Sequence, residues 1–169
     1  MKAAGAMITG AANALAVAGL SILLILAAFT LLDGLLRAFA NYPLDLVREI
    51  GDLIAAICGA SCLPIVLLHR SNIVLRTFEN ILPAGGVRVI DVLAAAVVEI
   101  VMIGMAWQFY LFGLKTMRAG DVTWLRNLPK APFWFAVDGI LWVAVVVQTF
   151  VLIEEMTGAR RHREPEAVA

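Results

Sequence analysis

The feature that most constrains this chain is a run without any charged residue that extends over residues 3–32. A helix of about 20 apolar residues, rising 1.5 Å per residue, crosses the ~30 Å hydrocarbon core of a bilayer. The run is much longer than the ~7–15 apolar residues of a secretory signal peptide. We therefore predict a first membrane helix, over residues 12–32, that is retained in the protein.

Three further apolar stretches predict membrane helices over residues 44–68, 87–113 and 132–154. The composition agrees, because 62% of the residues are hydrophobic and 15% are charged, whereas soluble domains carry about 25% charged residues. The sequence thus predicts an all-α membrane protein with a single membrane domain over residues 1–169.

Two segments outside these spans are expected to behave differently. Apolar residues recur at helical spacing over residues 72–82, with polar residues between them. This pattern predicts a short amphipathic helix in the membrane interface between the second and third spans. The polar tail over residues 158–169 is expected to be disordered.

A cluster of charged residues surrounds the start of the second span. Arg48 can pair along the helix with Asp45 and Asp52, which lie three residues before it and four residues after it. Glu49 has no such local partner, so we expect it to pair with Arg37 at the end of the first span. These residues are predicted to be a structural ion cluster near the interface, because charges deep in lipid are costly.

Small side chains line one stripe of the second span. The stripe consists of Gly51, Ala55, Cys58, Gly59 and Cys62. Small residues let two membrane helices approach closely, so we predict a helix-packing seam, either within this chain or against another subunit. The alternative is that small residues are simply common in membrane helices. We interpret the two cysteines as packing residues and not as metal ligands or redox groups.

The third span contains an acidic residue, Glu99, near the middle of the membrane. It shares a stripe with Asp91, Ala95, Met102 and Ala106. An ionised group at that depth costs about 2.5–3.5 kcal/mol, so Glu99 should face protein and be paired, or be protonated. It is either a proton or substrate site or an interhelical hydrogen-bond anchor, and the sequence favours the anchor.

The distribution of basic residues predicts the orientation. With four spans, both termini lie on one side of the membrane. That side carries Lys2, Arg70, Arg76, Arg88, Arg160, Arg161 and Arg163. The other side carries fewer, namely Arg37, Lys115, Arg118, Arg126 and Lys130. Basic residues are enriched in cytoplasmic loops, so both termini are predicted to be cytoplasmic.

Several function classes find no support in the sequence. The formal net charge is zero, which argues against nucleic-acid binding. No phosphate-binding glycine loop or HExxH motif occurs, and neither histidine, His69 or His162, lies near a membrane-embedded Ser or Cys that it could activate. We predict no catalytic, cofactor or metal site in this chain, and no enzyme.

Short patterns along residues 11–155 resemble one transporter family. They begin with Arg37, Asn41, Pro43 and Glu49, and continue with His69, Arg70, Ser71, Asn72, Ile73, Val74, Leu82 and Pro83. Before the fourth span come Thr123, Trp124, Leu125, Pro132 and Trp134. Together with four spans in this length, they resemble the small, DctQ-like membrane subunit of tripartite ATP-independent periplasmic (TRAP) transporters.

The resemblance implies partners that the residues alone do not show. A large permease subunit in the bacterial inner membrane would hold the substrate and coupling-ion sites, the ion usually being sodium. A periplasmic binding protein would deliver an organic acid for symport. The small subunit would widen and brace the fixed scaffold of the permease. In that setting we expect Lys115, Arg118, Arg126 and Lys130, in the basic outer connector, to contact the binding protein.

Two other functions stay open at this point. A self-sufficient four-helix exporter coupled to protons could use Glu99 as its titrating residue, although such exporters usually carry their acid in the first span, which is uncharged here. A membrane anchor or assembly subunit of another complex is the second alternative.

Overall fold

The computed structural model describes residues 2–42, 45–69, 84–124 and 127–157. The helices are α1 (Lys2–Ala40), α2 (Asp45–Ser61), α3 (Leu63–His69), α5 (Ala84–Ala119) and α6 (Ala131–Thr157). Four stretches are long and apolar enough to cross a membrane, with α2 and α3 together supplying one of them. The prediction of an all-α membrane protein with four spans is confirmed. The predicted interfacial helix (72–82) and the disordered tail (158–169) lie outside the described residues.

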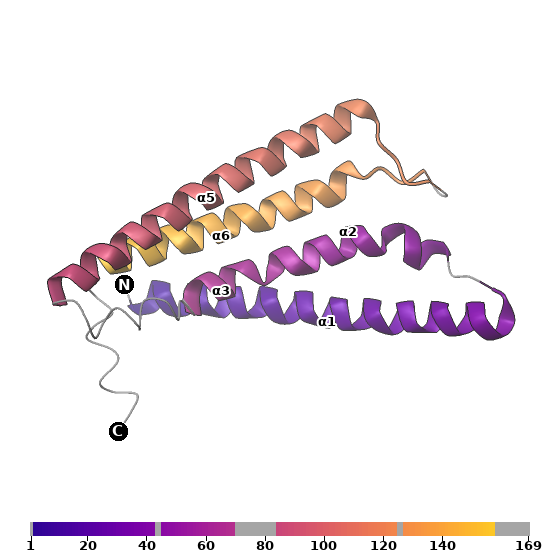
Figure 1. Ribbon diagram of the computed structural model, residues 1–169, viewed down its shortest axis with the longest axis horizontal. Helices are drawn as coiled ribbons and strands as arrows, with labels where there is room; N and C mark the ends of the chain where they lie inside the picture. The colour runs from indigo at the N-terminus through magenta and orange to yellow at the C-terminus, as the bar shows by residue number, and fades with distance from the viewer. Residues whose placement is uncertain (1, 43–44, 70–83, 125–126, 158–169) are drawn as a thin grey trace, which may run out of the picture.

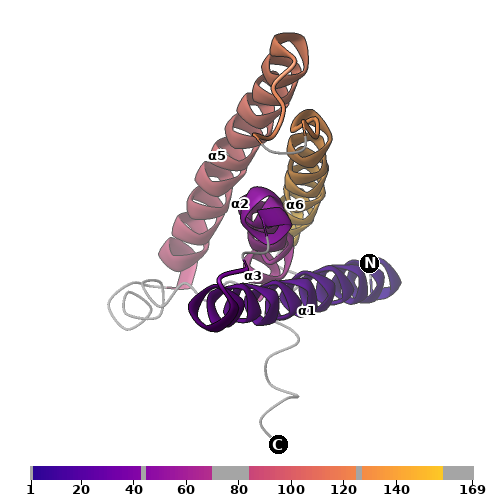
Figure 2. The same cartoon turned by 90° about the vertical axis from the view of Figure 1, so that its right-hand side faces the viewer.

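The spans form two antiparallel hairpins that pack together (Figure 1). In one hairpin α1 lies beside α2 and α3, and in the other α5 lies beside α6. α6 also packs against α2 and α3, and so joins the two hairpins. Viewed from the end, α2 lies between α1 and the α5–α6 pair (Figure 2). α1 is therefore held mainly by α2 and α3.

The helices extend beyond the predicted spans. α1 begins at Lys2 and α5 continues to Ala119, because the flanking Ala, Leu and Met residues are good helix formers. Residues that tolerate a left-handed backbone mark the ends. Asn41 follows α1 with φ 51°, and Gly120 follows α5 with φ 67°. Such residues commonly follow the last turn of a helix.

The second span is broken near its end by Pro64, as its position in the apolar run suggests. Proline has no backbone N–H and clashes with the preceding turn. α2 accordingly ends at Ser61 and α3 begins at Leu63. Local bonds connect the two pieces, because the Cys62 N–H donates to the Gly59 carbonyl at 3.3 Å and the Ser61 hydroxyl donates to the Cys58 carbonyl at 2.6 Å. The span stays continuous across the break.

The connector between α5 and α6 has an ordered backbone where it is described. Val122 pairs with Pro129 in an isolated antiparallel bridge. The Thr123 N–H donates to the Leu128 carbonyl at 2.9 Å, and the Leu128 N–H donates to the Thr123 hydroxyl at 3.0 Å. Thr123 is buried, so this side chain closes the turn from inside.

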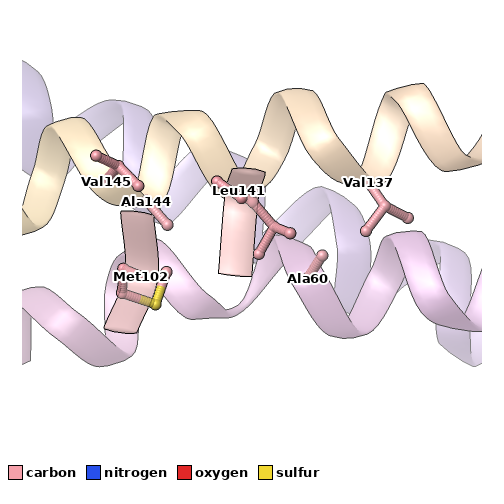
Figure 3. Packing of buried hydrophobic residues seen from close by; sticks show 7 residues of the cluster. Ala60, Met102, Val137, Leu141, Ala144 and Val145 are labelled. Atoms are coloured by element: carbon pink, nitrogen blue, oxygen red, sulfur yellow. The ribbon is translucent and has the colours of Figure 1, made fainter. Parts of the chain in front are cut away.

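The buried apolar core lies where α6 meets α5 and the end of α2. Its members are Ala60, Met102, Ala106, Val137, Leu141, Ala144 and Val145 (Figure 3). Ala106 and Ala144 are completely covered. Because lipid is as apolar as these side chains, close van der Waals packing and interhelical hydrogen bonds hold such helices together. The small alanines allow the helices to approach.

Candidate functional site

Polar side chains are buried between α5 and α6, inside the membrane-spanning part of the bundle. The most deeply covered of them is Gln148 of α6. Its Nε2 donates to the carbonyl oxygen of Ala95 on α5 at 3.1 Å. A side-chain amide can reach a helix carbonyl in this way only where the two backbones come close. This bond therefore fixes the register of the two helices near their shared end.

Glu99 lies next to this bond and makes a second polar contact across the same interface. Its Oε1 lies 2.7 Å from the hydroxyl oxygen of Thr149 on α6. The same hydroxyl oxygen lies 2.9 Å from the carbonyl oxygen of Val145, one turn earlier in α6. Glu99 is 9% exposed, and its Oε2 is buried without a hydrogen-bond partner among the described residues. The structure thus places Glu99 against protein, facing α6.

Asp138 is a second buried acid on α6. It is 6% exposed, and its Oδ1 has no hydrogen-bond partner in the described part of the chain. Phe135 packs against Gly113 of α5, and Thr149 contacts Glu99. This antiparallel register places Asp138 about level with residue 110 of α5. α6 therefore carries one acid, and α5 another, along the same interface.

Among the described glycines, the tightest contact with another helix is made by Gly19 of α1. A Cβ atom built on Gly19 would overlap the hydroxyl oxygen of Ser61 and would lie 2.9 Å from the Ser61 Cβ. It would also lie 3.3 Å from the carbonyl oxygen of Cys58. Only a residue without a side chain fits at this position, so Gly19 is what lets α1 dock on the end of α2.

The residues of the predicted seam do not share one contact within the chain. Cys58 is buried beside α1, whereas a Cβ on Gly51 would meet only the Leu26 side chain, at 3.8 Å. Gly59 is exposed, and a Cβ there would have nothing within 4 Å. Ala55 and Cys62 are half-buried. The glycine that makes the close contact is thus on the facing helix, and Gly59 points away from the rest of the bundle.

The predicted ion cluster is only partly described. Arg37 and Asp52 are exposed, and Glu49 is half-buried. The side chains of Asp45 and Arg48 lie outside the described residues. The pairing of Arg37 with Glu49 therefore stays a prediction. Asp33, one turn before Arg37, is buried.

The predicted contact residues of the outer connector gather at one end of the bundle. Lys115 and Arg118 are exposed in the last turns of α5, and Lys130 is half-buried just before α6. Arg126 lies outside the described residues. Trp124, in the turn between them, is 94% exposed. This end of the molecule therefore presents two exposed cations and an exposed aromatic ring.

Three residues in these contacts were not singled out from the sequence. Thr149 is one of several hydroxyl residues in the chain. Its role depends on the register of α5 and α6, which places it opposite Glu99. Gly19 lies in a run of small residues, and the sequence does not show which of them makes a close contact. Asp138 interrupts the fourth apolar run, but it was assigned no role. The available signal was that polar residues interrupt otherwise apolar helices at 99, 138 and 148–149, which an antiparallel pairing of α5 and α6 would bring together.

The arrangement resembles a set of interhelical contacts more than a reaction centre. Among the described residues, no group of three or more His, Cys, Asp or Glu side chains could hold a metal ion. The buried side chains of Glu99 and Gln148 form hydrogen bonds between the helices, and Glu99 does so with Thr149, which is itself exposed. Their chemistry is to donate and accept hydrogen bonds.

Comparison with protein families gives one match. The family described as "Tripartite ATP-independent periplasmic transporters, DctQ component" matches residues 26–161. Comparisons with curated proteins and with solved structures found no match. The matched region runs from the second half of α1 to the end of α6, and includes all the buried contacts between α5 and α6. This coverage of most of the chain, on a bundle of four membrane-capable spans, shows that the protein belongs to the DctQ component family of TRAP transporters.

Proposed function

We propose that this chain is a non-catalytic scaffold subunit that braces the large permease subunit of a TRAP transporter in the bacterial inner membrane. The observation that carries the proposal is the family match over residues 26–161. The large subunit would hold the sites for the organic acid and for the coupling ion, which we expect to be sodium. A periplasmic binding protein would deliver the acid. Both termini of this chain would lie in the cytoplasm.

The distribution of apolar side chains supports a bracing role. α1, α5 and α6 each carry large apolar residues that point away from the bundle, such as Leu24, Ile100 and Val146. These faces can be covered by lipid or by another membrane subunit. The bundle thus has a small core of its own and wide apolar surfaces, as suits a subunit that extends a larger membrane assembly.

The polar contacts support a fixed shape. Gln148 and Thr149 tie α6 to α5 at one end of the pair. Phe135 packs on Gly113 towards the other end, where a Cβ on the glycine would lie 3.1 Å from the ring. Contacts at both ends resist sliding and splaying of the two helices, which is what a static support requires.

Charge reversal at the outer connector tests the proposed contact with the binding protein. We expect the double substitution Lys115→Glu and Arg118→Glu to raise the binding-protein concentration needed for half-maximal uptake, because both side chains are exposed at the same end. Electrostatic attraction between partners is screened by salt, so the effect should be larger at low ionic strength. Uptake into proteoliposomes with all three components measures it.

Reversal of Arg160 and Arg161, which follow α6 on the terminal side, is the matched control and should leave this concentration unchanged. An equal response of the two double variants at low salt would show that the outer connector does not dock the binding protein.

A further inference from the structure

We propose that Glu99, the Thr149 hydroxyl and the Val145 carbonyl form a proton-binding site between α5 and α6, with Glu99 present as the neutral acid. The Glu99 O–H donates a hydrogen bond to the Thr149 oxygen, and the Thr149 O–H donates a hydrogen bond to the Val145 carbonyl. The site goes beyond the scaffold function, which does not require any particular protonation state.

The first argument is a count of protons at the Thr149 hydroxyl. Its oxygen lies 2.7 Å from Glu99 Oε1 and 2.9 Å from the Val145 carbonyl oxygen. A hydroxyl carries one proton and two lone pairs, so it can donate one full hydrogen bond. A carbonyl oxygen and an ionised carboxylate can accept hydrogen bonds but cannot donate them. Thr149 would then face two acceptors with one proton.

Placing a proton on Glu99 satisfies both contacts. The Glu99 O–H donates to the Thr149 oxygen, which uses a lone pair, and the Thr149 O–H donates to Val145. Heavy-atom positions leave the direction of a bond between two oxygens open, so this arrangement is compatible with the observed distances. The 2.7 Å separation is typical of an O–H···O bond.

The second argument concerns the other carboxyl oxygen. Glu99 Oε2 is buried and has no hydrogen-bond partner in the described part of the chain. An ionised carboxylate spreads its charge over both oxygens and needs donors at each of them. Burying a charged oxygen without a donor in a membrane interior costs much free energy. Burying the carbonyl oxygen of a neutral acid without a donor costs much less.

The charges along the surrounding helices point the same way. On α5 the neighbouring acid is Asp91, two turns before Glu99, and on α6 the acids after Thr149 are Glu154 and Glu155. On the core side of the site α6 carries Asp138. All four are acids, so none of them can supply positive charge to Glu99. The basic residue on these two helices that lies nearest in sequence is Arg88, three turns before Glu99 on α5, and its side chain lies outside the described residues. Within the described residues, Thr149 is the polar partner of the Glu99 side chain.

A metal cation fits this site poorly. The oxygens that converge on it are those of the Glu99 carboxyl, the Thr149 hydroxyl and the Val145 carbonyl. Hard cations take six or more oxygen ligands, roughly, in protein sites. A proton needs only the oxygen that carries it and one acceptor oxygen. The Glu99 carboxyl and the Thr149 hydroxyl supply these two atoms.

Infrared difference spectra of the full chain in lipid bilayers test the proposal. Near neutral pH, Glu99→Gln should lose one C=O band of a protonated carboxylic acid relative to the unmodified protein. Thr149→Val should move that band to higher frequency, because the acid loses its acceptor, and Thr149→Ser should restore the original position. Asp138→Asn is the matched control and should leave the Glu99 band in place.

Two outcomes would overturn the proposal. One is that Glu99→Gln removes carboxylate bands and no carboxylic-acid band. The other is that exchange of sodium for potassium at constant ionic strength abolishes the acid band, which would make the site a cation site.

Thermal unfolding of the same variants gives an independent readout. A glutamine amide can donate to Thr149 as a neutral acid does, so Glu99→Gln should keep the unfolding midpoint of the unmodified chain, whereas Thr149→Val should lower it. Failure of Glu99→Gln to fold would contradict a neutral Glu99.

Discussion

Replacing Gly19 with leucine will separate α1 from the end of α2 and sharply reduce the yield of folded chain. Even the first added atom would overlap the Ser61 hydroxyl oxygen and approach the Cys58 carbonyl to 3.3 Å, and the rest of a leucine has no room. Overpacking a tight contact costs about 1–3 kcal/mol, and more where backbone must move. Since α1 packs mainly on α2 and α3, loss of this contact removes most of its support within the bundle, although Gly5 also lies near Phe150 of α6.

The measurement is the folded fraction in detergent, followed by thermal unfolding and by protease resistance. The matched control is Gly10→Leu on the same helix, because that position is exposed and a Cβ there meets nothing within 4 Å. Equal behaviour of the two variants would contradict the close contact. A cycle with Ser61→Gly refines the test, since removing the Ser61 side chain should recover part of the stability lost in Gly19→Ala.

Replacing Gly59 with leucine is expected to have the opposite effect. The isolated chain should keep its stability but should bind the large subunit more weakly. Gly59 is exposed and has open space where a side chain would begin, so the isolated chain should unfold at the same temperature. If this face meets the large permease subunit, the added side chain will block close approach of the two helices. We expect at least a tenfold loss of affinity, or about 1.4 kcal/mol.

Co-purification of the two subunits, followed by uptake, measures this effect. Gly104→Leu on α5 and Gly139→Leu on α6 are matched controls, because both glycines are exposed with nothing within 4 Å of a Cβ. A normal complex and normal uptake with Gly59→Leu would remove this face from the interface. A loss only with Gly104→Leu or Gly139→Leu would assign the interface to another helix.

The fold could be predicted because the apolar runs encode it directly. Residues 3–32 contain no charge, and the other three runs have similar lengths, so the number and type of spans follow from the thickness of the bilayer. Pro64 marks the break between α2 and α3 for a reason that is visible in the sequence, since proline cannot continue the hydrogen-bond ladder. The helices are longer than the predicted spans because the flanking residues are good helix formers.

Pairwise contacts between helices were harder to predict, because they depend on register. The stripe of small residues on the second span predicted a packing seam that includes Gly59. The tight contact instead involves Gly19 of α1, which meets Ser61 and Cys58. Periodicity predicts which residues share a helix face, but not the rotation or the level of the helix that packs on it.

Glu99 shows the same limit. Its depth predicts that it must face protein, and the structure places it against α6. Its partner Thr149 could not be chosen from the sequence, because α6 also offers Gln148 and Asp138 as polar side chains. The antiparallel pairing of α5 and α6 decides between them, by placing Gln148 beside the Ala95 carbonyl and Thr149 beside Glu99.

Reconstituted uptake tests the central claim, that this chain supports a TRAP permease and does not transport by itself. Proteoliposomes would receive the large subunit and the binding protein with and without this chain, or this chain alone, and uptake of a panel of labelled dicarboxylates and sialic acid would be followed under a sodium gradient. We expect uptake of one of these acids with all three components, and no uptake when this chain is alone or omitted. Uptake or efflux by this chain alone, or full activity without it, would contradict the scaffold function.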